Sequence, residues 1–164
     1  MDKVYHTRNT ERMTQDRVIH LFQEKLGYEY LGNWHARPNN SNVEEEYLIR
    51  FLSKQGHSKE IISRTLDLIS QTIHQFDKSL YQRNKEFCAK LRYGVVTKIE
   101  ANKHNETIAL IDWKHPKNNH FAIAEEVTIE GKATKRPDII LYINGIAICV
   151  LELKSAQNRR TPRP

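Results

Sequence analysis

The chain has 164 residues, of which 38% are hydrophobic and 28% charged, a composition typical of globular rather than disordered proteins. Its two cysteines, Cys88 and Cys149, lie far apart, and no Cys/His group has zinc spacing. This argues against a disulfide framework and a structural zinc site. No apolar segment approaches the length of a membrane span or of a signal-peptide core, so we expect a cytoplasmic protein without a membrane partner.

The net charge of +6 is concentrated toward the end of the chain, where residues 131–164 contain seven Lys and Arg residues and two acidic residues. Positive charge attracts the phosphate backbone of DNA. Many basic proteins nevertheless bind no polyanion, and part of the surplus lies in a basic tail, residues 157–164, which is equally consistent with a solvated chain end. Charge alone therefore leaves DNA binding open.

Apolar residues at helical spacing predict a mainly helical region over residues 1–93. The first helix is expected to begin at Thr10 or a neighbouring residue and to end at Gly27. Residues 27–42, rich in Asn and containing Pro38, are expected to form a loop. The further expected helices run from an Asn42 cap to Gly56, from a Ser58 cap to Phe76, and over residues 80–91 with an end near Gly94.

After Gly94 the pattern changes to short β-branched segments, which predict a sheet over residues 94–156. The expected strands are 95–99, 107–113, 121–129, 139–143 and 146–154. The last two flank Asn144-Gly145, a strong hairpin signal, and are apolar on successive positions, which is typical of central strands covered on both faces. We therefore expect one α+β domain over residues 1–156, with a mixed central sheet flanked by helices.

Two charged residues, Glu152 and Lys154, interrupt the last apolar strand, and Asp138 precedes its hairpin partner. Because buried charges are costly unless they are paired or bind a metal, these residues are candidates for chemistry. The alternative is a structural ion pair or a strand end that reaches solvent, and an isolated Glu-x-Lys favours that alternative. The full set is more specific: Pro137-Asp138, thirteen intervening residues, then Glu152-Leu153-Lys154 is the PD-(D/E)xK nuclease pattern.

The residue types suit phosphodiester hydrolysis. Asp138 and Glu152, with the backbone carbonyl of Leu153, form a set of oxygen ligands for Mg²⁺, for which Mn²⁺ can substitute. Lys154 would orient or deprotonate the attacking water and stabilise the negative charge that develops on the phosphate. Glu11 is a weaker candidate for a metal ligand, because an acid in the first turns of a helix is also stabilised by the helix dipole. Arg136, Lys135 and, more weakly, Lys132 are candidates for binding DNA.

The segment from Arg136 to Lys154 resembles the nuclease signature of type I restriction enzyme R subunits, in which a Pro-Asp strand, an Asn-Gly turn and a Glu-Leu-Lys strand follow one another. Several upstream segments are similar to the same subunits. They are Thr10-Glu11, residues 26–34, residues 37–42, residues 91–94 and residues 111–113. The resemblance therefore covers nearly the whole chain and implies the N-terminal nuclease domain of an R subunit, with a restriction-endonuclease-like core, in a prokaryotic cell.

The resemblance implies a longer protein. In the family, an ATP-driven DNA translocase and a helical segment that docks on the methyltransferase (M) and specificity (S) subunits follow the nuclease domain. This sequence has no GxxxxGK[ST] phosphate loop, so ATP would act only through domains absent here, and cleavage of double-stranded DNA would be non-specific and follow translocation. The family's Gln-x-x-x-Tyr helix after the catalytic lysine is absent from residues 155–164, which leaves the activity of the isolated chain in doubt.

Two other functions fit the same residues. One is a catalytically incomplete DNA-binding or assembly module of the same fold, and the other is a stand-alone repair nuclease.

Strand register puts a further condition on the nuclease hypothesis. With a simple two-residue turn at Asn144-Gly145, Asp138 would be opposite Leu151 and would point away from Glu152. A shared metal therefore requires a shift of one residue. We expect a bulge at Gly145 to supply it; the alternative is a break in the strand at Pro137-Asp138.

Overall fold

The computed structural model describes residues 2–98, 105–130 and 134–154. These residues form two compact units, of which the first contains the described residues of 1–42, 121–142 and 147–164 and the second those of 43–120 and 143–146. The expected basic tail, residues 157–164, lies outside the described residues. Within the described part of the chain, no helix combines the length and the apolar character that a membrane crossing requires.

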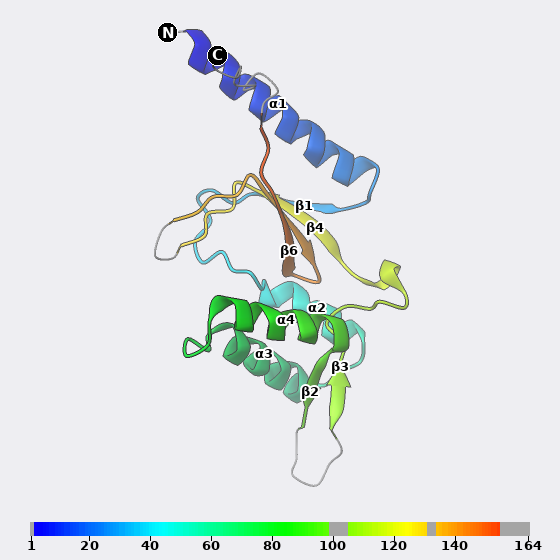
Figure 1. Ribbon diagram of the computed structural model, residues 1–164. Coiled ribbons are helices and arrows are strands. Elements are labelled where there is room, and N and C mark those ends of the chain that lie inside the picture. The colour runs from blue at the N-terminus through cyan, green and yellow to red at the C-terminus, as the bar shows by residue number, and fades with distance from the viewer. Residues whose placement is uncertain (1, 99–104, 131–133, 155–164) are drawn as a thin grey trace, which may run out of the picture. The chain divides into compact units, whose positions relative to one another are not determined.

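The first unit is built on a mixed four-stranded sheet with the strand order β1-β4-β5-β6 (Figure 1). The strands are β1 (Glu29–Asn33), β4 (Phe121–Glu125), β5 (Ile139–Ile143) and β6 (Ile146–Leu151). β1 pairs with β4 in parallel, although the two strands are separated by some ninety residues of sequence. A single helix precedes the sheet, α1 (Asp2–Glu24).

The side chains on the two faces of this sheet belong to different hydrophobic clusters. On one face, Ile139 and Leu141 of β5 pack with Ile19 of α1. On the other, Ile140 and Tyr142 pack with a group that contains Trp34. This alternation is that of a strand buried on both faces, and β5 has the burial that the sequence predicted for a central strand.

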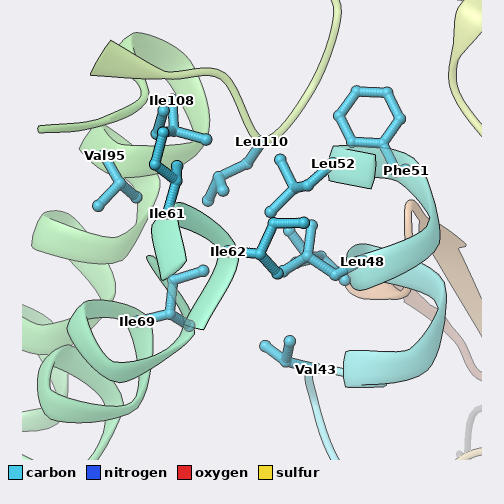
Figure 2. Packing of buried hydrophobic residues seen from close by; sticks show 11 residues of the cluster. Val43, Leu48, Phe51, Leu52, Ile61, Ile62, Ile69, Val95, Ile108 and Leu110 are labelled. Carbon is cyan, nitrogen blue, oxygen red and sulfur yellow. The ribbon is translucent and has the colours of Figure 1, made fainter. Parts of the chain in front are cut away.

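The second unit consists of helices and a small antiparallel sheet. Its elements are α2 (Glu45–Lys54), α3 (Lys59–Ile73), α4 (Leu80–Tyr93), β2 (Val95–Thr97), β3 (Glu106–Ile108) and the 3-10 helix η1 (Pro116–Asn118). Figure 2 shows its core, in which Leu48 and Leu52 of α2, Ile62 of α3 and Ile108 of β3 are almost completely buried. The chain is thus an α+β protein, as the sequence predicted.

Two of the predicted helix ends are confirmed and two are wrong. Ser58 caps α3 by accepting a hydrogen bond from the Ile61 amide, and α4 ends at Gly94. By contrast, α1 begins at Asp2 rather than near Thr10, since no Gly or Pro in residues 2–9 interrupts the helix. The residue at the start of α2 is Glu44, without a side-chain capping bond, and not Asn42.

Several predictions about strands are also wrong. The strands expected over residues 107–113, 121–129 and 146–154 end earlier, at Ile108, Glu125 and Leu151, and β2 and β3 form a separate sheet rather than part of the central one. Residues 27–42 are not all loop, because Glu29–Asn33 forms β1. The pairing of β1 with β4, which includes an irregularity between Tyr30 and Gly32, outweighs the weak local strand propensity of a segment that contains Gly and Asn. In addition, β6 is an edge strand rather than a central one, and Ile148 and Val150 are 42% and 52% exposed.

The hairpin between β5 and β6 has a two-residue turn and not the expected bulge. Asn144 and Gly145 both have positive φ, 50° and 80°, as a type I′ turn requires. The Asn144 side chain holds the turn by accepting from the His120 amide and by donating to the Leu110 carbonyl, at 2.8 and 2.9 Å. These bonds favour the left-handed conformation that asparagine tolerates better than most residues.

Candidate active site

A polar pocket of about 290 Å³ lies in the first unit, where α1 meets the ends of the sheet strands. Two arginines, three carboxylates and one amide converge on it. Its lining residues are Glu11, Arg12, Gln15, Glu126, Arg136, Asp138 and Leu153. The pocket therefore brings together Asp138, Leu153 from the Glu152-Leu153-Lys154 segment, and the weaker candidate Glu11.

Asp138 lies immediately before the first residue of β5 and is half-buried. Its Oδ2 accepts a 2.6 Å hydrogen bond from the backbone amide of Leu153. Its own carbonyl accepts from the Glu126 amide at 2.9 Å and from the Gln15 side chain at 3.2 Å. The Asp138 carboxylate is thus held by the backbone that follows β6, and the Asp138 backbone is held by Glu126 after β4 and by Gln15 of α1.

The change of one residue in the register between β5 and β6 lies within β6, after the Asn144-Gly145 turn. Ala147 packs in the cluster that contains Tyr142, as a two-residue turn requires, whereas Leu151 and Leu153 pack in the cluster that contains Ile139. These two clusters lie on opposite faces of β5. Ala147 near the start of β6 therefore faces one side of the sheet and Leu151 at its end faces the other, whereas residues four positions apart in a regular strand face the same side. The change of face that a common site requires therefore occurs within β6.

Glu152 and Lys154 flank Leu153 and are exposed to solvent. β6 ends at Leu151, so both residues follow the strand, whereas the sequence suggested that they interrupt a buried one. Only the Leu153 part of this segment lines the pocket. Within the described ranges, no group of three or more His, Cys, Asp or Glu side chains is placed to hold a metal ion.

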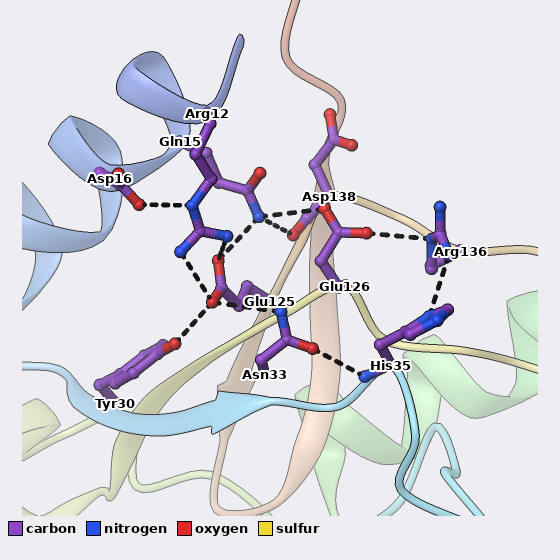
Figure 3. A network of polar contacts seen from close by, with 10 residues as sticks. All are labelled: Arg12, Gln15, Asp16, Tyr30, Asn33, His35, Glu125, Glu126, Arg136 and Asp138. Carbon is purple, nitrogen blue, oxygen red and sulfur yellow. Dashed lines mark hydrogen bonds and ion pairs between the residues drawn. The ribbon is translucent and has the colours of Figure 1, made fainter. Parts of the chain in front are cut away.

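A second carboxylate, Glu125, is the centre of the polar network in Figure 3. It ends β4 and is only 2% exposed. Arg12 of α1 donates to both of its oxygens, at 2.9 and 3.2 Å, and Gln15 and Tyr30 donate at 2.9 and 2.8 Å. A buried carboxylate is tolerated when its oxygens are hydrogen-bonded in this way, and these bonds join α1 to the end of β4.

The network changes the acidity of its members. The hydrogen bond to Glu125 raises the pKa of Arg12, and the attraction of the same carboxylate acts in the same direction. Burial, followed by the hydrogen bond to Glu125, raises the pKa of Tyr30 to about 12. Arg12 and Tyr30 therefore stay protonated throughout the physiological range, and the network holds a fixed arrangement of charge beside the pocket.

Glu126 turns the chain away from β4 with a positive φ of 52°, which is uncommon for a residue other than glycine. Its carboxylate forms an ion pair with Arg136 at 3.0 Å and accepts a hydrogen bond from Gln15 at 3.4 Å. The Arg136 guanidinium also contacts Nδ1 of His35 at 2.9 Å. Arg136, a predicted DNA-binding residue, is thus placed at the pocket by contacts within the protein.

The other predicted residues have different positions. Glu11 lines the pocket as a half-buried residue of α1. Lys135 is exposed, and its backbone forms an isolated bridge with Ile129. Lys132 lies outside the described residues.

The sequence did not identify Glu125, Glu126, Arg12 or Gln15 as residues of this site. One signal was available, since Glu125 and Glu126 follow the apolar segment Phe121–Ala124, and a charge at the end of an apolar strand was the feature that singled out Glu152. Nothing local, however, connects either glutamate with α1, more than a hundred residues away.

Comparison with known families gives the decisive observation. The family model described as "Type I restriction enzyme R protein N terminus" matches residues 8–163, nearly the entire chain. The chain belongs to this family. The resemblance inferred from the Arg136–Lys154 segment is therefore confirmed.

Curated relatives from an archaeon and a bacterium agree with this assignment. The putative type I restriction enzyme MjaIXP endonuclease subunit of Methanocaldococcus jannaschii is 27% identical over 153 residues, 85% of this chain and 15% of the relative. The type I restriction enzyme HindI endonuclease subunit of Haemophilus influenzae is 38% identical over 80 residues, 46% of this chain and 8% of the relative. The chain thus spans only a small part of the length of these relatives.

Proposed function

We propose that this chain is a Mg²⁺-dependent DNA endonuclease domain, with Asp138, Glu152 and Lys154 as its active-site residues. The observation that carries the proposal is the 2.6 Å hydrogen bond from the Leu153 amide to the Asp138 carboxylate, within a pocket that Glu11 also lines. This bond joins the two halves of the PD-(D/E)xK pattern, in a chain whose family is that of type I restriction enzyme R proteins.

The ligand chemistry of the pocket fits a hard divalent cation. Mg²⁺ prefers oxygen ligands and retains several waters, so one or two carboxylates are sufficient in sites where phosphate also binds. Asp138 in the pocket and Glu152, which is exposed next to Leu153, would hold the ion, with the Leu153 carbonyl as a third ligand and Glu11 as a weaker candidate. When bound, the cation would neutralise charge on the phosphate and acidify a water.

The protein's own groups would supply the rest of the chemistry. The ammonium group of Lys154 would orient or deprotonate the attacking water and stabilise the transition state. Arg136, with Lys135 and Lys132 near it in the sequence, would position the phosphate backbone. The network around Glu125 would keep α1, and with it Glu11, fixed against the strand ends.

In the complete enzyme, we propose that this domain cuts double-stranded DNA without sequence preference after ATP-driven translocation by the rest of the R protein. Its partners there would be the methyltransferase and specificity subunits. These roles rest on family membership alone, since the chain spans 8% and 15% of the two relatives.

Nicking of supercoiled plasmid by the purified chain tests the proposal, with Mg²⁺ or Mn²⁺ and with a chelator as control. We expect metal-dependent nicking that falls at least about a hundredfold in Asp138→Ala and Lys154→Ala, the loss typical of a removed catalytic group. Lys85→Ala, on α4, is the matched control and should nick at the wild-type rate. Metal-independent nicking, or equal rates for all variants, would contradict the proposal. DNA binding without nicking would favour the incomplete assembly module.

A further inference from the structure

A second pocket, of about 240 Å³, lies within the second unit between α2 and a later segment that consists of η1 and the two residues after it. α2 contributes Tyr47, Arg50 and Lys54 to its lining, and the later segment contributes Lys117, Asn118 and His120. None of these residues belongs to the Asp138 pocket.

The charged side chains that line this pocket are all positive. Three cationic side chains line it, and no lining residue that the structure describes has a carboxylate. Arg50 forms an ion pair with Glu46 one turn earlier, at 3.0 Å, but the two side chains are 64% and 80% exposed. Such a pair contributes little and is easily exchanged for another anion, so the pocket favours a negatively charged ligand.

The segment that contains Lys117 is held in place before any ligand arrives. The Asp112 carboxylate accepts from the Lys114 and His115 amides and, at 2.8 Å, from the Asn118 side chain. The last of these bonds is the main cause that lowers the pKa of Asp112, which favours the ionised carboxylate that accepts all three bonds. Preorganisation of this kind reduces the entropy lost on binding.

An aromatic wall completes the pocket. The rings of Tyr47 and His120 stack at 5.1 Å with an interplanar angle of 6°, and the Arg50 guanidinium lies 5.3 Å from the Tyr47 ring centre. Arg50 and Lys54 are four residues apart on one helix and therefore project from the same side. The cations thus form a row on α2 with a third from the opposite wall, an arrangement suited to an extended chain of phosphates.

We propose that this cationic pocket, formed by Arg50, Lys54 and Lys117, binds the phosphate backbone of DNA. Contacts of this type carry no sequence information and are strongly salt-dependent. The proposal rests on the proposed function in so far as DNA is the substrate, and it adds a contact surface built from residues distinct from those of the cleavage site.

Fluorescence anisotropy with a labelled duplex, in chelator-containing buffer so that no cleavage occurs, tests this proposal across a series of salt concentrations. The triple variant Arg50→Ala, Lys54→Ala, Lys117→Ala should bind more weakly, and the slope of log K against log salt should flatten by about 2 to 3, at about 0.9 for each lost phosphate contact. A control triple removes the same charge elsewhere on the second unit, at Lys59, Arg64 and Lys85. It should change the slope by less than about 1.

Equal effects of the two triple variants, wild-type binding by the pocket variant, or no binding by the wild type would overturn the proposal. Circular dichroism of both triples checks that they are folded. Millimolar ATP can be tested as a competitor of the labelled duplex. If ATP displaces the duplex from the wild type and from the control variant but not from the pocket variant, the pocket would be assigned to a free nucleotide instead. Binding is measured in chelator and nicking is measured with Mg²⁺, so failure of the cleavage proposal and failure of the binding proposal give different results.

Discussion

Glu125 lies at the end of an apolar strand and is almost inaccessible to solvent, yet its oxygens accept hydrogen bonds from Arg12, Gln15, Tyr30 and Asn33. Its role was not predictable from the sequence, because all four of these partners come from α1 or β1 and are more than ninety residues away. Asp138 was predictable, because Pro137 and the later Glu-x-Lys form a recognisable pattern. A residue of a recognisable motif can thus be singled out from the sequence, although the catalytic role of Asp138 stays a prediction. Residues that contact the motif from distant parts of the chain cannot be singled out in this way.

Replacing Glu125 by Ala should destabilise the protein by about 2 to 3 kcal/mol, because the bonds to a buried charge are lost while the half-exposed Arg12 is free to be solvated. The exposed Glu130→Ala is the control and should change the free energy of unfolding by less than about 0.5 kcal/mol. Urea unfolding followed by circular dichroism measures both. Equal midpoints for the two variants would show that the network contributes nothing to stability.

Tyr30 gives this network a signature in the alkaline range. Because its pKa is raised from 10.0 to about 12 in the folded protein, the stability that it contributes is fully present below pH 10 and is lost as the pH rises toward 12. The ultraviolet absorbance of tyrosinate can be titrated in the wild type and in Tyr30→Phe. The difference between the two titration curves should have a midpoint near pH 12. A midpoint near 10 would mean that Tyr30 is neither buried nor bonded as described.

At the scale of elements, prediction succeeded where the signal is local. Ser58, Gly94 and the position of the hairpin turn at Asn144-Gly145 were identified correctly because capping and turn geometry depend on a few adjacent residues, although the bulge expected at Gly145 was wrong. Prediction failed where pairing between strands that are distant in the sequence determines the structure. β1 exists because β4 pairs with it, and no local pattern shows that the apolar β6 lies at a sheet edge.

Gly145 tests how much the hairpin turn depends on close packing. A Cβ at this position would overlap the Glu44 carbonyl oxygen and approach the Tyr47 Cβ to 2.9 Å, at a φ of +80°. Gly145→Ala should therefore cost about 2 to 4 kcal/mol, from conformational strain of about 1 kcal/mol together with overpacking. Gly56→Ala is the matched control, since its φ is +89° and nothing lies within 4 Å, and it should cost only about 1 kcal/mol. Equal changes in thermal midpoint would exclude the steric contribution.

At the scale of the whole molecule, the chain has two compact units, and the proposed functions are divided between them. The first unit holds the Asp138 pocket and the second holds the cationic pocket of Arg50, Lys54 and Lys117. The family was recognisable from the sequence because its motif is short and ordered along the chain. The second pocket was not, because its walls come from segments about seventy residues apart.

The central claim is that a divalent cation binds at Asp138. Electron paramagnetic resonance of Mn²⁺, whose free-ion signal decreases on binding, measures this directly in the purified chain and does not depend on catalytic activity. The account predicts that the wild type binds Mn²⁺, that excess Mg²⁺ displaces it, and that Asp138→Ala loses the site while Asp67→Ala, an exposed aspartate of α3, retains it. Equal Mn²⁺ binding by the wild type and Asp138→Ala, or no binding by the wild type, would contradict the account.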